Sequence, residues 1–398
     1  MNNRTKLLKD EKVQWKTLGE VAELKRGTTI TAKSKTEGNI PVISGGQKPA
    51  YYNGEFNRDG ETITVAGSGA YAGFVMYWNE PIFVSDAFSI KANQEIVLPR
   101  YIYHFLLSIQ SQIHDLKSGG GVPHVYAKDV ARFKIPIPPL HIQQEIVAIL
   151  DKFTELTAEL TAELTAELTA RKKQYDYYRE QLLSVDDKGL INGVKAEWKT
   201  LGEVGELVRG NGLPKSDFTE TGIPAIHYGQ IYTYYKTHTT ETISFVSPET
   251  AEKLQKVNYG DVVITNTSEN IEDVGKSLVY LGQEQAVTGG HATIFKPSNE
   301  ILGKYFAYFT QTEIFASQKR KLAKGTKVID VSAKDLAKIK IPIPPLSEQE
   351  LIVSILDKFD TLTTSISEGL PKEIELRQKQ YAYYREQLLD FPKNNIES

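Results

Sequence analysis

Two short segments carry the residue types of nucleotide-binding loops, but neither has the context that such a loop needs. Residues 65–69 read VAGSG after the β-prone run TIT, which resembles a loop that binds a nucleotide or S-adenosylmethionine. A helix should follow that loop, whereas the β-prone run FVMYW comes next. Residues 275–277 read GKS like the end of a P-loop, but Asn270 stands where that motif needs its first glycine. We therefore expect turns at both places and no ATP site.

Nuclease and metal chemistry lack support for similar reasons. Residues 197–199 read EWK, part of a nuclease-like pattern, but a second copy of this segment has Gln14 at the acidic position. The seven histidines, from His104 to His291, contain no ligand-spaced pair, and cysteine is absent. Zinc sites need such clusters, and disulfides, iron-sulfur clusters and thiol nucleophiles need cysteine. The sequence therefore predicts no catalytic residue and no metal site, and the lack of cysteine fits a reducing cytoplasm.

Length and charge favour several globular domains whose binding sites are local. At about 150 residues per domain, 398 residues predict two or three domains, and 40% hydrophobic residues can form their cores. The net charge of -3 creates no global field that would draw the chain onto DNA. The first ten residues show no apolar leader, and the longest uncharged stretch is interrupted by glycines, so we expect neither secretion nor a membrane span.

An internal repeat spans almost the whole chain. Residues 15–24 read WKTLGEVAEL and residues 198–207 read WKTLGEVGEL, an offset of 183, and an Arg-Gly pair follows each. KIPIPPLHIQQEIVAILDKF at 134–153 and QYDYYREQLL at 174–183 recur 206 residues later with few changes. The second copy therefore has 23 additional residues, all between its GEV start and its IPIPPL end. The ends of the copies match, while their middles diverge.

The middles and the segments after IPIPPL predict different structures. The middles, roughly 25–134 and 208–340, contain short β-prone runs separated by Gly, Asn and Pro, which favours mixed α/β globules. No Gly or Pro interrupts 141–183, where apolar residues recur at helical spacing. We expect one long helix there, about 65 Å long at 1.5 Å per residue, that acts as a spacer.

The helical segments of the two copies differ in detail. In the second copy, Ser347 and Glu350 have capping-box spacing, and Gly369 with Pro371 predicts a break into two shorter helices. The first copy carries TELTAELTAELTAELTA from Thr154, with a leucine at every fourth residue. These leucines drift by about 40° per step and form a slanted stripe that can line one partner helix. An exposed helix of good helix formers is the alternative, although the equal lengths of the two arms favour a partner.

The paired motifs resemble the specificity subunits of type I restriction-modification systems over nearly the whole chain. GEV starts, IPIPPL exits, LDKF helices and YYREQLL ends all occur twice. The resemblance implies an α/β (α+β) fold with target-recognition domains at 1–140 and 186–346. Between and after them it implies helical spacers at 141–185 and 347–398 that pack as an antiparallel coiled coil. Because only the first spacer has the TAEL ladder, the two-fold relation of the arms is approximate.

Candidate DNA contacts lie in the diverged middles, where the family pattern assigns no individual residue. The stretch 25–134 has twelve basic and nine acidic residues and 208–340 has sixteen and fourteen, whereas 141–183 has five and eight. Basic or polar side chains in Gly-flanked loops could reach phosphates or bases. We predict DNA contacts by Arg26, Lys48, Ser68, Tyr71, Lys117, His124, Arg209, Lys215, Thr267, Ser268, Lys319, Lys324 and Lys327. Singly, each is also typical of a solvated surface residue, but the loops around 117–119 and 324–327 align at the offset of 206.

The repeated YYRE segments give two equivalent surfaces that could dock two copies of a partner. The resemblance implies that these partners are modification subunits. The predicted partner-binding residues are Tyr175, Tyr177, Tyr178, Arg179, Tyr381, Tyr383, Tyr384 and Arg385. Alternatively, these tyrosines only pack the helices against each other.

The resemblance implies a non-catalytic, DNA-reading subunit in which each domain recognises half of a split, asymmetric double-stranded target and the helices act as a ruler. S-adenosylmethionine, ATP and Mg²⁺ would then bind to separate modification and restriction subunits. We expect a cytoplasmic location. Two other classes stay open: a stand-alone methyltransferase or nuclease, which S-adenosylmethionine binding by the pure chain would favour, and a coiled-coil scaffold, which sequence-indifferent DNA binding would favour.

Overall fold

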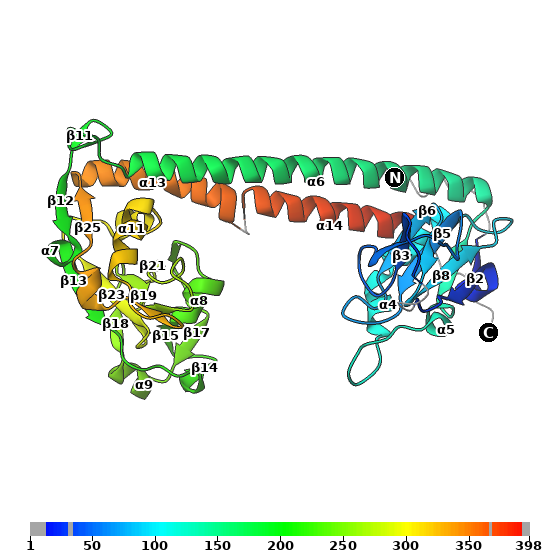
Figure 1. The fold of residues 1–398 in the computed structure, drawn as a ribbon, viewed down its shortest axis with the longest axis horizontal. Helices are drawn as coiled ribbons and strands as arrows, with labels where there is room; N and C mark the ends of the chain where they lie inside the picture. Colours follow the sequence, from blue (N-terminus) through cyan, green and yellow to red (C-terminus); the bar gives the residue numbers. More distant parts are fainter. Residues whose placement is uncertain (1–12, 31–34, 366–367, 392–398) are drawn as a thin grey trace. The chain divides into compact units, whose positions relative to one another are not determined.

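The computed structural model describes residues 13–30, 35–365 and 368–391 (Figure 1). They form two compact units, Met1–Glu163 with Ile374–Ser398 and Leu164–Glu373, each with its own hydrophobic core. The first ten residues, in which the sequence predicts no apolar leader, lie outside the described part of the chain. In the part that is described, no helix combines the length and the apolar character that a membrane crossing requires.

The globule of the first unit is built on a four-stranded antiparallel sheet. Its strands, in spatial order, are β2 (Ala22–Arg26), β8 (Ala87–Ala92), β5 (Glu61–Ala66) and β6 (Val75–Asn79). A smaller sheet contains β4 (Tyr51–Asn53), β3 (Ile40–Ile43) and β7 (Phe83–Val84), and a ribbon pairs β1 (Gln14–Thr17) with β9 (Lys134–Ile137). The helices are α2 (Leu18–Val21), α3 (Pro99–Ser108), α4 (Gln110–Asp115) and α5 (Ala127–Val130). The ETITVA segment forms the buried interior strand β5 because β-branched residues pack well on a pleated surface.

The second unit has a similar but larger globule. Its main sheet has the order β13 (Gly205–Arg209), β23 (Ala292–Pro297), β19 (Val262–Thr265), β21 (Ser277–Tyr280) and β16 (His238–Thr239). Its second sheet has the order β14 (Phe218–Thr219), β17 (Ser244–Val246), β15 (Ile223–Ile226), β22 (Ala286–Thr288) and β18 (Gln255–Val257). Three ribbons pair β10 (Leu190–Ile191) with β11 (Val194–Lys195), β12 (Glu197–Thr200) with β25 (Lys340–Ile343), and β20 (Thr267–Ser268) with β24 (Ile329–Asp330). The short helices are α7 (Leu201–Val204), η1 (Lys215–Asp217), α8 (Tyr228–Thr233), α9 (Pro248–Lys253), α10 (Gly303–Phe309), α11 (Glu313–Leu322) and α12 (Ala333–Leu336).

The repeat seen in the sequence is a repeat of structure. The WKT start pairs antiparallel with the KIPI exit in both copies, as β1 with β9 and as β12 with β25. The LGEV helix after each start has a capping box, made by Thr17 with Glu20 in one copy and by Thr200 with Glu203 in the other. The additional residues of the second copy enlarge the second sheet, which has five strands instead of the three seen among the described residues of the first unit. Insertions are therefore confined to the diverged middle.

The long helices follow the sequence prediction closely. Helix α6 runs without a break from Leu140 to Leu182, whereas the second copy forms α13 (Leu346–Thr364) and α14 (Leu370–Leu389). Gly369 separates α13 from α14 with a φ of +86°, in the left-handed region that favours glycine. The predicted capping box of Ser347 and Glu350 is wrong. Because α13 already begins at Leu346 after Pro345, the Ser347 hydroxyl lies inside the first turn and cannot act as the N-cap.

Each unit contains an antiparallel pair of helical segments, and each pair combines the two copies. In the first unit, the start of α6 packs beside the end of α14, where Phe153 stacks on Tyr384 with ring centroids 5.7 Å apart. In the second unit, the end of α6 packs beside α13, where Phe359 stacks on Tyr178 with centroids 5.6 Å apart. Phe153 and Phe359 are equivalent in the repeat, as are Tyr384 and Tyr178. The YYRE end of each copy therefore pairs with the LDKF helix of the other copy.

Equivalent polar contacts fix each globule to its own helix. The buried Gln143 accepts a hydrogen bond from the amide of Leu98 at 2.9 Å, and Gln349 accepts one from the amide of Leu302 at the same distance. Eight residues further along each helix, or about two turns, lies an aspartate with two partners on the globule. Asp151 contacts Arg100 and His104, and Asp357 contacts Lys304 at 2.8 Å and Tyr308 at 2.6 Å. Such contacts hold a globule in one orientation on its helix.

The leucine ladder is only partly covered. Leu164 is buried, Leu160 and Leu168 are half-buried, and Leu156 is 46% exposed. The burial therefore changes from step to step, as expected for a four-residue repeat on a helix with 3.6 residues per turn.

Candidate DNA interface

In the first unit, the structure brings the predicted DNA contacts together in three neighbouring loops, one of which joins α4 to α5, and one strand end. The loop after β5 pairs with the loop before α5 through a bridge between Ser68 and His124 and a 3.0 Å hydrogen bond from the amide of Gly69 to the carbonyl of Pro123. Lys117, in the loop from α4 to α5, donates to the carbonyl of Ala70 at 3.1 Å. The exposed Tyr71 lies in the same loop as Ser68.

Arg26 and the loop of Lys48 complete this surface. Arg26 ends β2 and lines a cavity of about 60 Å³ with Asp86, His124 and Tyr126. The Ser68 hydroxyl donates a hydrogen bond to the Asp86 carboxylate, which fixes the loop. The loop of Lys48 follows β3 and comes so close that a Cβ on Gly45 would lie 2.5 Å from the carbonyl oxygen of Ser68. A mixed polar surface with basic side chains in loops is typical of contacts to phosphates and base edges.

The second unit gathers the equivalent loops. Strand β20, with Thr267 and Ser268, pairs with β24, so that Thr267 lies opposite Asp330. Arg209 ends β13 and its guanidinium lies 3.9 Å from the Asp330 carboxylate. Lys324 and Lys327 lie in the exposed loop that leads into β24. The predicted alignment of this loop with that of Lys117 is confirmed by equivalent backbone bridges, between 118 and 124 and between 324 and 330.

Two sets of polar contacts shape this surface of the second unit. The Thr267 hydroxyl lies 3.0 Å from a ring nitrogen of His291, whose ring contacts Tyr228. Lys324 and Lys338 both contact the carboxylate of Asp335. Hydrogen bonds from Lys338, Ser332 and Lys324 hold the pKa of Asp335 well below its usual range, so this carboxylate stays ionised and anchors the base of the loop.

One of the predicted contacts, Lys319, does not face solvent, and another, Lys215, lies in a separate segment. Lys319 is 5% exposed, and its ammonium group donates to the carbonyls of Glu272 at 3.1 Å and Val274 at 2.7 Å. Burial lowers the pKa of Lys319, and the amine braces the turn at Gly275 instead of facing solvent. Lys215 lies exposed in η1. Burial of the His227 ring lowers the pKa of His227, and the nearby charge of Lys215 lowers it further. The burial of Lys319 could not be predicted from the sequence, because a buried and an exposed lysine look alike in a polar segment.

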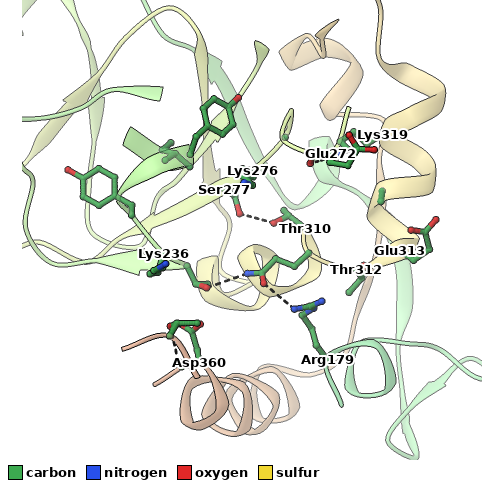
Figure 2. Close-up of a pocket in the computed structure, with 18 of the residues that line it drawn as sticks. Arg179, Lys236, Glu272, Lys276, Ser277, Thr310, Thr312, Glu313, Lys319 and Asp360 are labelled. Atoms are coloured by element: carbon green, nitrogen blue, oxygen red, sulfur yellow. Dashed lines mark hydrogen bonds between the residues drawn. The ribbon is translucent and has the colours of Figure 1, made fainter. Parts of the chain in front are cut away.

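The second unit also has a polar cavity of about 580 Å³ that the sequence did not predict (Figure 2). In it, Arg179 donates to Gln311 at 3.4 Å, and Gln311 donates to Thr237 at 3.3 Å. The hydroxyls of Ser277 and Thr310 lie 2.8 Å apart. Its charged lining residues are Arg179, Lys236, Glu272, Lys276, Glu313, Lys319, Arg320 and Asp360. They come from segments far apart in the chain, so no local motif could reveal the cavity.

The predicted partner-binding residues divide into two groups. Tyr175 is buried against Phe359, and Tyr381 bonds to Thr154 through its hydroxyl, so these two pack the helices together. Arg179 and Arg385 lie over the rings of Tyr175 and Tyr381, with 5.1 and 5.2 Å to the ring centroids. By contrast, Tyr177 and Tyr383 are 61% and 57% exposed, and Tyr178 and Tyr384 are 40% and 41% exposed. The exposed tyrosines remain available to a partner.

Comparison with known proteins places this duplicated arrangement in a family. The model of the "type I restriction modification DNA specificity domain" matches residues 10–170 and again residues 194–376. The chain belongs to this family. The specificity subunit of the Escherichia coli type I restriction enzyme EcoR124I/EcoR124II is 34% identical, covering 99% of this chain and 98% of its own. A Haemophilus influenzae protein named provisionally as specificity subunit S.HindORF215P is also 34% identical, covering 98% and 99%.

Solved structures share the fold of this specificity subunit. One such chain comes from a structural study of the assembly and conformational transition of a type I restriction-modification system. It has a TM-score of 0.67 at 20% identity, covering 95% of this chain and 97% of its own. The HsdS subunit of Thermoanaerobacter tengcongensis has a TM-score of 0.52 and covers 95% of both chains. These structures confirm the predicted fold class. The family model and the Escherichia coli relative confirm the predicted role as a non-catalytic DNA-recognition subunit.

The segments that resembled catalytic motifs are structural. Residues 67–73 form a turn between β5 and β6, and Gly275 and Lys276 lead into β21, which begins at Ser277. The EWK segment starts β12, whose partner strand is the KIPI exit. Among the described residues, no group of three His, Asp or Glu side chains could hold a metal ion.

Proposed function

We propose that each globular domain of this specificity subunit reads one half of a bipartite, asymmetric double-stranded DNA target. One observation carries the proposal: the two copies share a scaffold, with equivalent ribbons, capping boxes and helix contacts, but differ in the loops that this scaffold presents. A shared scaffold gives both domains the same way of docking on DNA, whereas different loop side chains select different bases.

The long helices set the gap between the half-sites. This role is supported by α6, which is continuous over 43 residues, and by the polar contacts that fix each globule to a helix. A helix with satisfied internal hydrogen bonds and a packed neighbour resists bending, so a fixed number of turns corresponds to a fixed gap.

The exposed YYRE tyrosines dock two modification subunits, one on each pair of helices. Their duplicated positions, Tyr177 with Tyr383 and Tyr178 with Tyr384, support two equivalent docking sites. Aromatic side chains with a polar tip are enriched in such interfaces. S-adenosylmethionine binds to these modification subunits, and ATP and Mg²⁺ bind to restriction subunits of the same cytoplasmic complex.

Methylome sequencing tests the proposal directly. A host without other methyltransferases should express this chain with its modification subunit, and the methylated motif should be read from the genome. We expect two short specific sequences separated by a fixed number of unspecified bases. A continuous motif would contradict the two-domain readout, and methylation without any motif would favour a scaffold.

A further inference from the structure

One loop has the same backbone in both globules. In the first unit, Ser118 and His124 exchange backbone hydrogen bonds of 3.0 and 2.8 Å. In the second unit, Lys324 and Asp330 exchange bonds of 2.9 and 2.8 Å. We call these two segments, 118–124 and 324–330, the paired loops.

The paired loops share only two residues, and one of them has a backbone explanation. They read SGGGVPH and KGTKVID, so that Gly119 matches Gly325 and Val122 matches Val328. The glycines have φ values of +115° and +102°, in the left-handed region. A Cβ on Gly119 would also lie 3.0 Å from the Val122 carbonyl oxygen, and one on Gly325 would lie 2.0 Å from the Val328 carbonyl oxygen.

The second shared residue has no explanation in folding. Val122 is 56% exposed and Val328 is 60% exposed. A few residues further on, the equivalent Val125 and Val331 are 2% and 0% exposed, so their identity follows from the core. A single exposed valine is ordinary, but its recurrence at the same position of two otherwise diverged loops indicates a shared contact outside the chain.

The surroundings of the paired loops favour DNA as that contact. An arginine shared by both copies lies beside each loop: Arg26 lines the small cavity with His124, and Arg209 lies 3.9 Å from Asp330. Further basic side chains lie in or next to the loops, namely Lys117, Lys324 and Lys327. Arginine next to lysine-bearing loops complements the charge of a phosphate backbone.

We propose that Val122 and Val328 are duplicated, sequence-independent DNA contacts. This inference rests on the proposed function, because two domains that read different bases can share only contacts to what both half-sites have in common. Those common features are the phosphates, the sugars and the apolar faces exposed at a base step. The arginines bind the phosphates, and each valine packs its stiff, β-branched side chain against a sugar or a base step in the groove. The residues that differ between the two loops select the bases.

The test compares Val122→Ser and Val328→Ser with Ile243→Ser, each in the full chain assembled with its modification subunits. Ile243 is a matched control, since its side chain is 46% exposed outside the paired loops. Binding is measured by fluorescence anisotropy on two labelled duplexes, one with the methylated motif of the wild-type complex and one of random sequence. Motif and subunit stoichiometry are determined for each variant.

We expect each valine variant to bind both duplexes about tenfold more weakly, because an apolar contact of one side chain is lost. The motif, the stoichiometry and the slope of affinity against salt should not change, and the control should bind like the wild type. Unchanged binding, a changed motif, or lost assembly at unchanged DNA affinity would each overturn the inference. If the wild-type complex shows no bipartite motif, the proposed function fails, while a tenfold loss on the random duplex would still support the valine contact.

Discussion

The hydroxyl of Thr154 lies 2.7 Å from the hydroxyl of Tyr381, joined by a hydrogen bond between residues that are 227 positions apart in the sequence. The equivalent residues in the second unit are Asp360 and Tyr175, and there the buried Tyr175 hydroxyl has no hydrogen-bond partner in the described structure. Burial raises the pKa of Asp360, because the charged carboxylate is removed from water. The two helix pairs therefore share aromatic packing, but the tyrosine hydroxyl is hydrogen-bonded in the first unit and not in the second.

Replacing Asp360 by threonine should stabilise the second unit at neutral pH. The change removes a buried charge and provides a hydroxyl for Tyr175, and we expect a gain of about 1 kcal/mol in the free energy of unfolding. Threonine and aspartate have similar helix propensities, so the helix itself is little affected. Thermal unfolding of Asp360→Thr and of the exposed-site control Asp187→Thr measures the effect.

The same comparison has a definite pH dependence. Because the folded pKa of Asp360 is raised, the cost of its charge is present above that pKa and disappears as the pH falls toward the ordinary aspartate range. The stability difference between Asp360→Thr and the wild type should therefore shrink between pH 7 and about pH 4. A difference that grows on acidification would show that Asp360 is stabilised as a carboxylate.

The exposed and buried tyrosines of the YYRE segments should behave differently when they are truncated. Tyr177→Ala and Tyr383→Ala should each lower the occupancy of one of two modification subunits, with the thermal stability of the free chain almost unchanged. Tyr175→Ala should instead destabilise the chain by about 2 to 4 kcal/mol, since it opens a cavity beside Phe359. Mass photometry gives the stoichiometry. Tyr259→Ala, at a 67% exposed tyrosine of the globule, is the control and should assemble normally.

Deleting one unit of the ladder, Thr161–Leu164, should shorten the gap between the half-sites by about one base pair and leave both half-sites unchanged. Four helical residues remove about 6 Å of rise and a net rotation of about 40°, and one base-pair step turns by about 35°. The rise alone would suggest nearly two base pairs, at about 3.4 Å each, but the helix need not run along the DNA axis.

Methylome sequencing of the deletion variant decides this point. Leucine replaces leucine along the ladder, so the packing pattern of α6 survives the deletion. A gap of unchanged length, or altered bases in either half-site, would show that this helix is not the ruler.

The sequence predicted the scaffold better than the surface because the motifs that form the scaffold occur in both copies of the repeat. The uninterrupted helix to Leu182 and the break at Gly369 follow from the absence or presence of helix breakers, and both predictions are confirmed. The predicted capping box at Ser347 is wrong because the N-cap of α13 is Pro345, two residues earlier, a shift that spacing alone cannot resolve. The enlarged second sheet of the second unit also lies in the diverged middle, where no second copy guided the prediction.

The sequence predicted the parts of the candidate DNA interface whose loops align in the repeat. It did not predict which side chains are buried and therefore cannot reach DNA. The loops of Lys117 and Lys324 were matched from the offset alone, and the structure gives them the same backbone. The burial of Lys319 and the cavity around Gln311 depend on contacts between segments far apart in the chain. The pairing of the LDKF helix of one copy with the YYRE helix of the other, which brings Thr154 next to Tyr381, likewise depends on tertiary structure. Both motifs could be seen in the sequence, but their pairing could not.

The central claim, that two independent domains each read one half of the target, is tested most directly by exchanging residues 208–340 for the equivalent middle of another specificity subunit. The methylated motif of the chimera should keep the half-site and the gap of the parent chain and acquire the other half-site from the donor. Such modularity follows if base readout is confined to the loops of each globule. A motif in which both half-sites have changed would contradict the account.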